Sequence, residues 1–120
     1  MIVAGFGCRQ AATQHSFESA LNRAMQAASA CPDALATLDT KSQQLRQLAA
    51  QKNLPLLLFD LECLQSQQTM TQSDAAHAVY GTGSIAEAAA IAASGPKARL
   101  LSVRVISEDQ LATCALAAGD

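Results

Sequence analysis

Short apolar runs alternate along the chain with longer stretches in which apolar residues recur at helical spacing. The apolar runs cover residues 2–6, 34–38 and 56–59 and predict strands, and the continuous first run predicts a strand buried on both faces. The stretches with helical spacing cover residues 16–30, 41–53 and 85–94. Strands separated by helices in this way predict right-handed parallel crossovers.

The C-terminal part of the chain has a different pattern. Apolar and polar residues alternate from Leu101 to Val105, which predicts a half-exposed strand, and residues 111–117 follow as its antiparallel partner. Two shorter helices are expected after Asp60 and from Ser73. We therefore predict one domain over residues 1–120 with an α/β fold: a three-layer α/β/α sandwich around a five-stranded mixed sheet, the last strand antiparallel.

Composition and charge exclude several classes of protein. Half of the residues are hydrophobic, only 3% are aromatic and the formal net charge is -2, so we expect no nucleic-acid partner. The four cysteines are widely separated and His15 and His77 stand alone, which predicts reduced thiols, surface histidines and no metal site. The first apolar run lacks a charged leader and is too short to cross a membrane, so we expect a cytoplasmic protein without a membrane partner.

The first candidate loop follows the first strand, from Gly5 to Arg9. In open α/β sheets, ligands bind beyond the carboxyl ends of the strands. Gly5 and Gly7 have no Cβ, so the backbone can approach a ligand, and Arg9 adds a positive guanidinium. We predict these three residues as ligand-binding. Cys8 lies beside Arg9 and near a helix N-terminus, which favours the thiolate, so it is a candidate nucleophile; packing under the loop is the alternative.

The second candidate loop follows the second strand. Thr40 and Gln43 fit a capping box at the start of the next helix. Lys41 lies in the first turn of that helix, where a cation opposes the helix dipole. A residue in a locally unfavourable position is a candidate ligand-binding residue, and a solvated surface lysine is the alternative. Asp39 is a candidate acid, either for the ribose of a nucleotide or as a general base.

The third candidate loop is Gly81-Thr82-Gly83-Ser84. Ser84 and Glu87 fit a second capping box, which accounts for both residues without a ligand. Capping does not explain Gly81, Thr82 and Gly83, which are typical of an anion-binding nest at a helix N-terminus. We predict all four loop residues as ligand-binding, and Glu87 is a further candidate for a general base.

The three loops together resemble one known family. Their sequences, GFGCR at 5–9, TLDTK at 37–41 and GTGSIAEAAA at 81–90, are similar to those of the CobE proteins and of the C-terminal domain of CbiG, from cobalamin biosynthesis. The resemblance runs from Ile2 to Ala117. In the family, the lysine segment usually continues as K-x-x-E, whereas this chain has Gln44 in place of the glutamate.

The resemblance implies a similar fold, with strand order 3-2-1-4-5, and a role on a precorrin or other corrinoid intermediate. CbiG proteins open the ring-A lactone of cobalt-precorrin-5A and release acetaldehyde, while a stand-alone domain of this length looks more like CobE. We therefore expect a protein that either binds such an intermediate or hydrolyses its lactone, with Cys8, Asp39 and Glu87 as candidate catalytic residues. We expect no cofactor, and other cobalamin-biosynthesis enzymes as further partners.

Two other function classes also fit the sequence. One is a small nucleotide-binding domain that uses Gly5, Gly7 and Asp39, although Gln10 replaces the third glycine of the dinucleotide fingerprint. The other is a non-catalytic interaction module whose Ala-rich helices and half-exposed strand bind another subunit. The corrinoid hypothesis differs from both because it requires the three loops to meet in one positively charged hollow.

Overall fold

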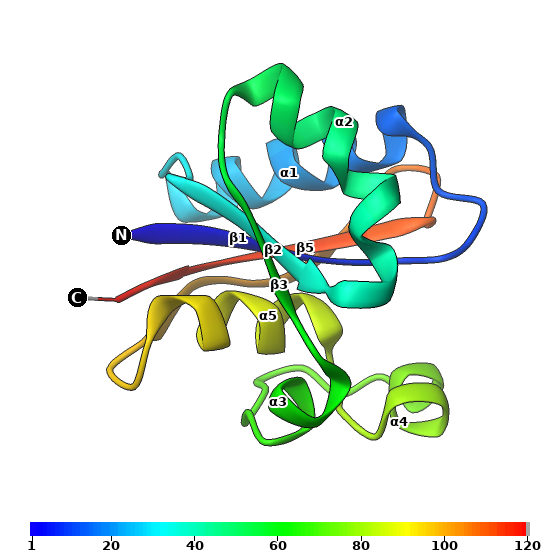
Figure 1. The fold of residues 1–120 in the computed structure, drawn as a ribbon, viewed down its shortest axis with the longest axis vertical. Helices are drawn as coiled ribbons and strands as arrows, with labels where there is room; N and C mark the ends of the chain where they lie inside the picture. The colour runs from blue at the N-terminus through cyan, green and yellow to red at the C-terminus, as the bar shows by residue number, and fades with distance from the viewer. Residues whose placement is uncertain (120) are drawn as a thin grey trace.

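The computed structural model describes residues 1–119, in which a mixed sheet lies between two layers of helices (Figure 1). The strands are β1 (Ile2–Cys8), β2 (Ala34–Leu38), β3 (Leu56–Phe59), β4 (Arg99–Ile106) and β5 (Ala112–Ala118). The helices are α1 (Gln14–Ala28), α2 (Ser42–Lys52), α3 (Leu61–Gln65), α4 (Asp74–Tyr80) and α5 (Ile85–Ser94), with a 3₁₀ turn η1 (Asp39–Lys41) before α2. The predicted α/β/α sandwich is confirmed.

The strand order is β3-β2-β1-β5-β4, in which β1, β2 and β3 are parallel and β5 is antiparallel to both of its neighbours. The antiparallel last strand is therefore confirmed, whereas the order 3-2-1-4-5 implied by the family resemblance is wrong for the last two strands. Residues 112–118 are almost all small, apolar and buried, which suits a position inside the sheet. β4 exposes Arg99, Val103 and Ile106 along its length, which suits an edge.

The helices cover the two faces of the sheet unequally. α1 and α2 pack on one face, and α5 with α3 on the other (Figure 1). On the first face, the rings of Phe6 and Phe17 meet edge to face, with their centroids 6.0 Å apart. On the second face, the alanines of α5 are buried directly against β1. Within residues 1–119, no helix has the length and apolar character needed to cross a membrane.

The backbone of α5 lies very close to β1 at Gly5. A Cβ on this residue would lie 2.5 Å from the Ala90 amide nitrogen and nearer still to the Ala86 carbonyl oxygen, both on the backbone of α5. Its own backbone is in the middle of β1, paired with β2 and β5. Helix packing therefore explains this glycine, rather than the ligand contact expected from the sequence.

The connection from β2 to α2 differs from the prediction. The ends of α1 and α2 lie within two residues of the predicted ends, but the Thr40–Gln43 capping box is wrong. Residues 39–41 form η1, and α2 begins at Ser42 with Lys41 as its N-cap and without a side-chain cap. The tight turn replaces the cap because the Asp39 carbonyl already accepts the Ser42 N–H.

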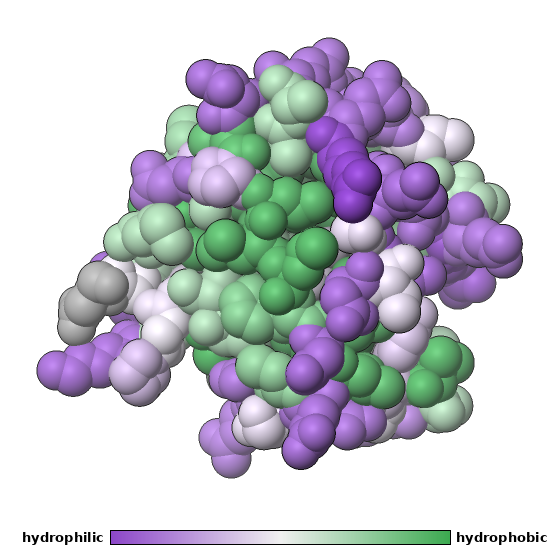
Figure 2. All heavy atoms as spheres, in the orientation of Figure 1, coloured by the Kyte–Doolittle hydropathy of each residue, from purple (hydrophilic) through white to green (hydrophobic). Residues whose placement is uncertain are grey.

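β3 forms the other edge of the sheet and consists of four consecutive apolar residues. Leu58 is 45% exposed and the other three side chains are half-buried. Figure 2 shows apolar side chains gathered in the middle of the face where β3 crosses the front of Figure 1. This edge is thus less polar than the β4 edge, which carries two arginines.

We expect Gly5→Ala to lower the free energy of unfolding by about 3 kcal/mol or more, because over-packing costs about 1–3 kcal/mol even where side chains can adjust. Here the obstacles are backbone atoms. Gly7→Ala is the matched control, since its Cβ would lie 2.9 Å from Thr113 Oγ1, on a side chain that can rotate. Urea denaturation measures both losses. Equal losses would contradict the assigned role of α5 at position 5.

Candidate functional site

A pocket of about 520 Å³ lies at the carboxyl edge of the sheet, where segments distant in sequence meet. The ends of β1 and β4, the start of β5, the N-terminus of α5 and one side of α4 line it, together with Lys41 of η1. β1 and β4 end at the same edge because both are antiparallel to β5. The position is where open α/β sheets bind ligands, and the volume is typical of small-molecule sites.

The charged residues that line this pocket are all positive, and we call it the cationic pocket. They are Arg9, Lys41 and Arg104, three of the eight lysines and arginines in the chain, and no Asp or Glu of the described residues 1–119 lines the pocket. The hydroxyls of Ser73 and Ser84 add hydrogen-bond donors. The net charge of -2 therefore conceals a local positive field, and a local field governs the capture of a charged ligand.

Apolar side chains form another wall of the cationic pocket. Val79 of α4 and Ile106 of β4 are 68% and 43% exposed. Tyr80, Ile85 and Leu111 also line the pocket. Exposed apolar surface beside three cations fits a ligand with an apolar body and several acidic substituents.

Gln44 of α2 holds the loop that carries Arg9. Its amide nitrogen donates to the carbonyl oxygens of Arg9 at 3.4 Å and Gln10 at 3.3 Å, and its amide oxygen accepts from the Cys8 thiol at 3.6 Å. The Arg9 N–H donates to the Leu111 carbonyl at 2.8 Å. A glutamate at position 44 cannot donate to the two carbonyls, so the amide suits this loop. In the sequence, the departure from K-x-x-E was the one signal that pointed to Gln44.

Cys8 lacks the surroundings of an activated thiol. Burial raises the pKa of the Cys8 thiol, and the nearby Lys41 ammonium lowers this pKa by a smaller amount. The expectation that Arg9 and a helix N-terminus favour the thiolate is therefore wrong, because desolvation disfavours the charged form more strongly. Within residues 1–119, neither Cys8 nor another Cys, His, Asp or Glu belongs to a group of three or more that could hold a metal ion.

The η1 turn separates Lys41 from Asp39. Lys41 is half-buried and lines the cationic pocket. Asp39 is exposed and is not among the residues that line it. The positive residue of the second predicted loop thus lies in the pocket, and its acid lies outside.

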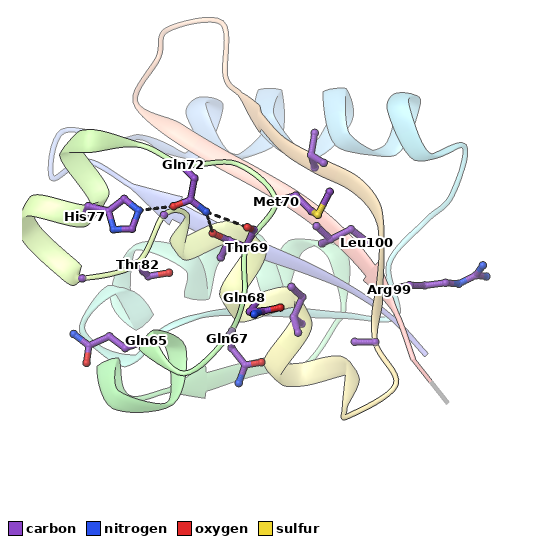
Figure 3. A pocket seen from close by; sticks show the side chains of 15 residues that line it. Gln65, Gln67, Gln68, Thr69, Met70, Gln72, His77, Thr82, Arg99 and Leu100 are labelled. Atoms are coloured by element: carbon purple, nitrogen blue, oxygen red, sulfur yellow. Dashed lines mark hydrogen bonds between the residues drawn. The ribbon is translucent and has the colours of Figure 1, made fainter.

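The Gly81–Ser84 loop is divided between two cavities. Ser84 is the N-cap of α5, where its hydroxyl accepts the Glu87 N–H at 3.2 Å, and it also lines the cationic pocket. Gly81, Thr82 and Gly83 line a second cavity of about 760 Å³ (Figure 3). The structure therefore brings Arg9, Lys41 and Ser84 together in one hollow, whereas the proposed nest lies in the other cavity and Gly5 and Asp39 line neither.

The second cavity is lined by glutamine and threonine side chains together with apolar side chains. The Gln72 amide nitrogen donates to Thr69 Oγ1 at 3.1 Å and its amide oxygen faces His77, so these side chains form one cluster (Figure 3). This cluster lies over the Gly83 turn. Arg99 also lines the cavity, and in Figure 3 its side chain extends away from the cluster. The second cavity therefore matches an anionic ligand less well than the cationic pocket. His77 is exposed, as predicted.

Glu87 is completely buried, and its carboxylate is fully engaged. It accepts the backbone N–H groups of Met70 at 2.6 Å, Thr71 at 3.0 Å and Arg104 at 2.8 Å, and the Thr71 hydroxyl at 2.6 Å. Only the Ser84 half of the predicted capping box forms, because the Glu87 side chain turns toward these other donors. Four donors use the acceptor capacity of a carboxylate, so Glu87 is poorly suited to act as a base.

Asp109 fixes the turn between β4 and β5 beside the cationic pocket. Its carboxylate accepts the hydroxyls of Ser107 and Ser16, each at 2.6 Å, and the Leu111 N–H at 3.1 Å. These hydrogen bonds lower the pKa of Asp109 to about 2, and the bond from Ser107 has the largest effect. The turn is thereby tied to the first turn of α1, and Leu111 is held at the pocket wall.

Arg104 is the pocket residue that sequence reasoning missed. It occupies a polar position of an alternating strand, where an exposed side chain is the ordinary expectation. In the structure its Nε is buried, with no hydrogen-bond partner among residues 1–119. No local pattern in the sequence distinguishes it from the other arginines.

Known proteins resemble this chain in both sequence and structure. The family model described as "Cobalamin synthesis G C-terminus" matches residues 2–117. The crystal structure of CobE, "a protein from the cobalamin (vitamin B12) biosynthetic pathway", is 30% identical with a TM-score of 0.84, over 98% of this chain and 89% of that one. The cobalamin biosynthesis protein chiG from Agrobacterium tumefaciens str. C58 is 29% identical with a TM-score of 0.76, over 100% and 99%.

A more distant structure shares the fold alone. It is a putative cobalamin biosynthesis protein G homolog from Sulfolobus solfataricus, 15% identical with a TM-score of 0.76 over 99% of this chain. This chain spans 37% of the length of that one. A search of curated proteins gives no match.

The family match extends over nearly the whole chain, and the CobE structure agrees with it in fold and in length. The resemblance first carried by the three loops is therefore confirmed. The chain belongs to the cobalamin synthesis G C-terminus family, of the CobE and CbiG type.

Proposed function

We propose that this chain binds a corrin or precorrin intermediate of cobalamin biosynthesis, with the acidic side chains of the ligand in the cationic pocket. The proposal rests on the charge of that pocket, which three cations line and, among residues 1–119, no carboxylate. Membership of the family supplies the pathway. The other cobalamin-biosynthesis enzymes would then be the sources and recipients of the ligand.

Corrin precursors match both walls of the cationic pocket. They carry acetate and propionate groups around a macrocycle that also has apolar substituents. Arg9 and Arg104 each present a guanidinium that can bind a carboxylate through two hydrogen bonds, and Lys41 adds a point charge. A helix N-terminus such as that at Ser84 contributes only about 0.3–1 kcal/mol toward an anion, so the three cations dominate recognition.

A nucleotide fits this geometry less well. The nucleotide hypothesis uses Gly5, Gly7 and Asp39, of which only Gly7 lines the cationic pocket. The space above Gly5 is filled by the backbone of α5, and Asp39 is outside the pocket. A phosphate chain would therefore meet neither the glycine turn nor the ribose-binding acid that the hypothesis requires.

The same residues favour binding over lactone hydrolysis. Hydrolysis needs an activated nucleophile or a free general base. The raised pKa of Cys8 disfavours its thiolate, the Glu87 carboxylate has four donors already, and Asp39 lies outside the pocket. We therefore propose a carrier that holds the intermediate between enzymes of the pathway.

We expect Arg9→Ala and Lys41→Ala each to weaken the binding of cobyrinic acid, a corrin with free carboxylates, by about 10-fold or more. A hydrogen bond to a charged group contributes about 1.5–3 kcal/mol, and 1.4 kcal/mol is 10-fold in affinity. Absorbance titration of the corrin measures the affinity.

Lys52→Ala is the matched control for this experiment, because Lys52 is exposed at the end of α2 and away from the pocket. It should leave the affinity unchanged. All three variants should unfold at nearly the temperature of the parent chain, since surface substitutions change stability little. Parent-like affinity in both pocket variants would contradict the proposed site.

We expect Cys8 to react with iodoacetamide at pH 8 more slowly than exposed Cys31, because the raised pKa of the Cys8 thiol leaves less thiolate. Lys41→Gln should slow Cys8 further, because it removes the charge that lowers this pKa, and should leave Cys31 unchanged. Mass spectrometry of the alkylated peptides measures both rates. Faster alkylation of Cys8 than of Cys31 would restore Cys8 as a candidate nucleophile.

A further inference from the structure

β4 contains a bulge at the residues that separate the two cavities. Ser102 pairs with Leu116 and Val105 with Cys114, so Val103 and Arg104 together stand opposite one residue of β5. A bulge of this kind leaves a backbone N–H outside the ladder and re-aims the side chains of the bulged strand. Val103 lines the second cavity and Arg104 the cationic pocket.

The Glu87 carboxylate accepts hydrogen bonds both from the β4 bulge and from residues 70 and 71. Its Oε2 accepts the Arg104 N–H at 2.8 Å and the Thr71 hydroxyl at 2.6 Å. Its Oε1 accepts the N–H groups of Met70 and Thr71 at 2.6 and 3.0 Å. One completely buried side chain of α5 therefore joins the edge strand to the segment that leads into α4.

That segment carries an apolar wall of the cationic pocket. α4 has no buried residue, so packing alone holds it weakly. Its flanks are fixed by the hydrogen bond from the Ser73 N–H to the Gly83 carbonyl at 2.9 Å and by the one from Gln65 Nε2 to the Tyr80 carbonyl at 2.8 Å. The hydrogen bonds of Glu87 at residues 70 and 71 anchor the same segment one turn earlier.

We infer that Glu87 is the positioning residue of the cationic pocket: through the β4 bulge it directs Arg104 into the pocket, and through residues 70 and 71 it fixes the wall that α4 provides. This inference rests on the proposed function and deepens it. With Arg104 in place beside Arg9 and Lys41, the pocket selects a corrin with at least three free acid groups.

An independent observation supports a ligand at Arg104. Its Nε is buried and has no acceptor among residues 1–119, and no carboxylate lines the pocket. A buried donor without a partner costs free energy, which an acid group of the ligand would recover. The Glu87 carboxylate does not supply this acceptor, because it accepts the backbone N–H of Arg104 and not a guanidinium N–H.

The test compares two corrins in four proteins. The probes are cobyrinic acid, with free carboxylates, and cobinamide, whose side chains are amides. The proteins are the parent chain, Arg104→Gln, Glu87→Gln and the double variant. We expect Arg104→Gln to weaken the binding of cobyrinic acid about 10-fold relative to the parent chain. Its affinity for cobinamide should stay within 2-fold of the parent value. Glu87→Gln should cause a similar loss, and the double variant should lose less than the two single losses combined, because Glu87 acts in part through Arg104.

Two further variants separate positioning from stability. Thr71→Val removes one donor from Glu87 and should give a smaller loss of the same kind, even where Glu87→Gln folds poorly. Ala24→Gly, in the buried face of α1, lowers stability away from the pocket and should leave the preference for cobyrinic acid over cobinamide unchanged. Hydrogen exchange should be faster at Thr71 and Arg104 in Glu87→Gln than in Ala24→Gly.

Different results would overturn different claims. Tight binding of cobyrinic acid by the parent chain with no loss in Arg104→Gln, or additive losses in the double variant, would contradict the role of Glu87 and leave the proposed function standing. The absence of cobyrinic acid binding by the parent chain would contradict the proposed function and this inference together.

Discussion

The close contact of α5 with β1 is the constraint from which the site follows. Gly5 lets the helix backbone reach the strand, and the alanines of α5 keep the two surfaces close. The helix N-terminus is thereby held at the carboxyl edge of the sheet, with Ser84 at the cationic pocket. The same contact buries Glu87, one turn further on, where its carboxylate must find donors in the protein.

Those donors come from two segments that are distant in the sequence. The β4 bulge supplies the Arg104 N–H, and the segment before α4 supplies three more. A buried carboxylate is costly unless its lone pairs are filled, so the arrangement is strongly determined once α5 is in place. Packing, backbone hydrogen bonding and the placement of charge are thus consequences of one helix position.

The local charge at the cationic pocket has the opposite sign to the net charge of the chain. The chain is slightly acidic overall, yet in the part of it that the structure describes three cations and no acid line the cationic pocket. The acids near this edge are either turned outward, as Asp39 is, or consumed by hydrogen bonds, as Glu87 and Asp109 are. A polycarboxylate ligand therefore meets little repulsion at the site itself.

The helices and strands could be predicted from the sequence more accurately than the order of the strands in the sheet. Continuous apolar runs identified β1 to β3, because consecutive apolar residues leave a clear local pattern both in the buried strands β1 and β2 and in the edge strand β3. The places of β4 and β5 were reversed, since strand order depends on contacts between distant residues. Arg9 and Lys41 were found because they adjoin strand ends, whereas Arg104 depends on a bulge that no local pattern indicates.

The roles of Gly5, Cys8 and Glu87 were misread for a similar reason. A glycine in a loop motif, a thiol beside an arginine and a glutamate in a capping position each have an ordinary local interpretation. Their actual surroundings are the backbone of α5, a desolvated strand end and the β4 bulge. Each of these is tertiary, so the local sequence could not reveal it.

A crystal structure of the chain soaked with cobyrinic acid would show whether the cationic pocket binds the corrin. We expect ligand carboxylates within hydrogen-bonding distance of the side chains of Arg9, Lys41 and Arg104, and the corrin edge against Val79 and Ile106. A ligand bound in the second cavity, or on the exposed β3 edge, with the three cations still unoccupied would contradict this expectation.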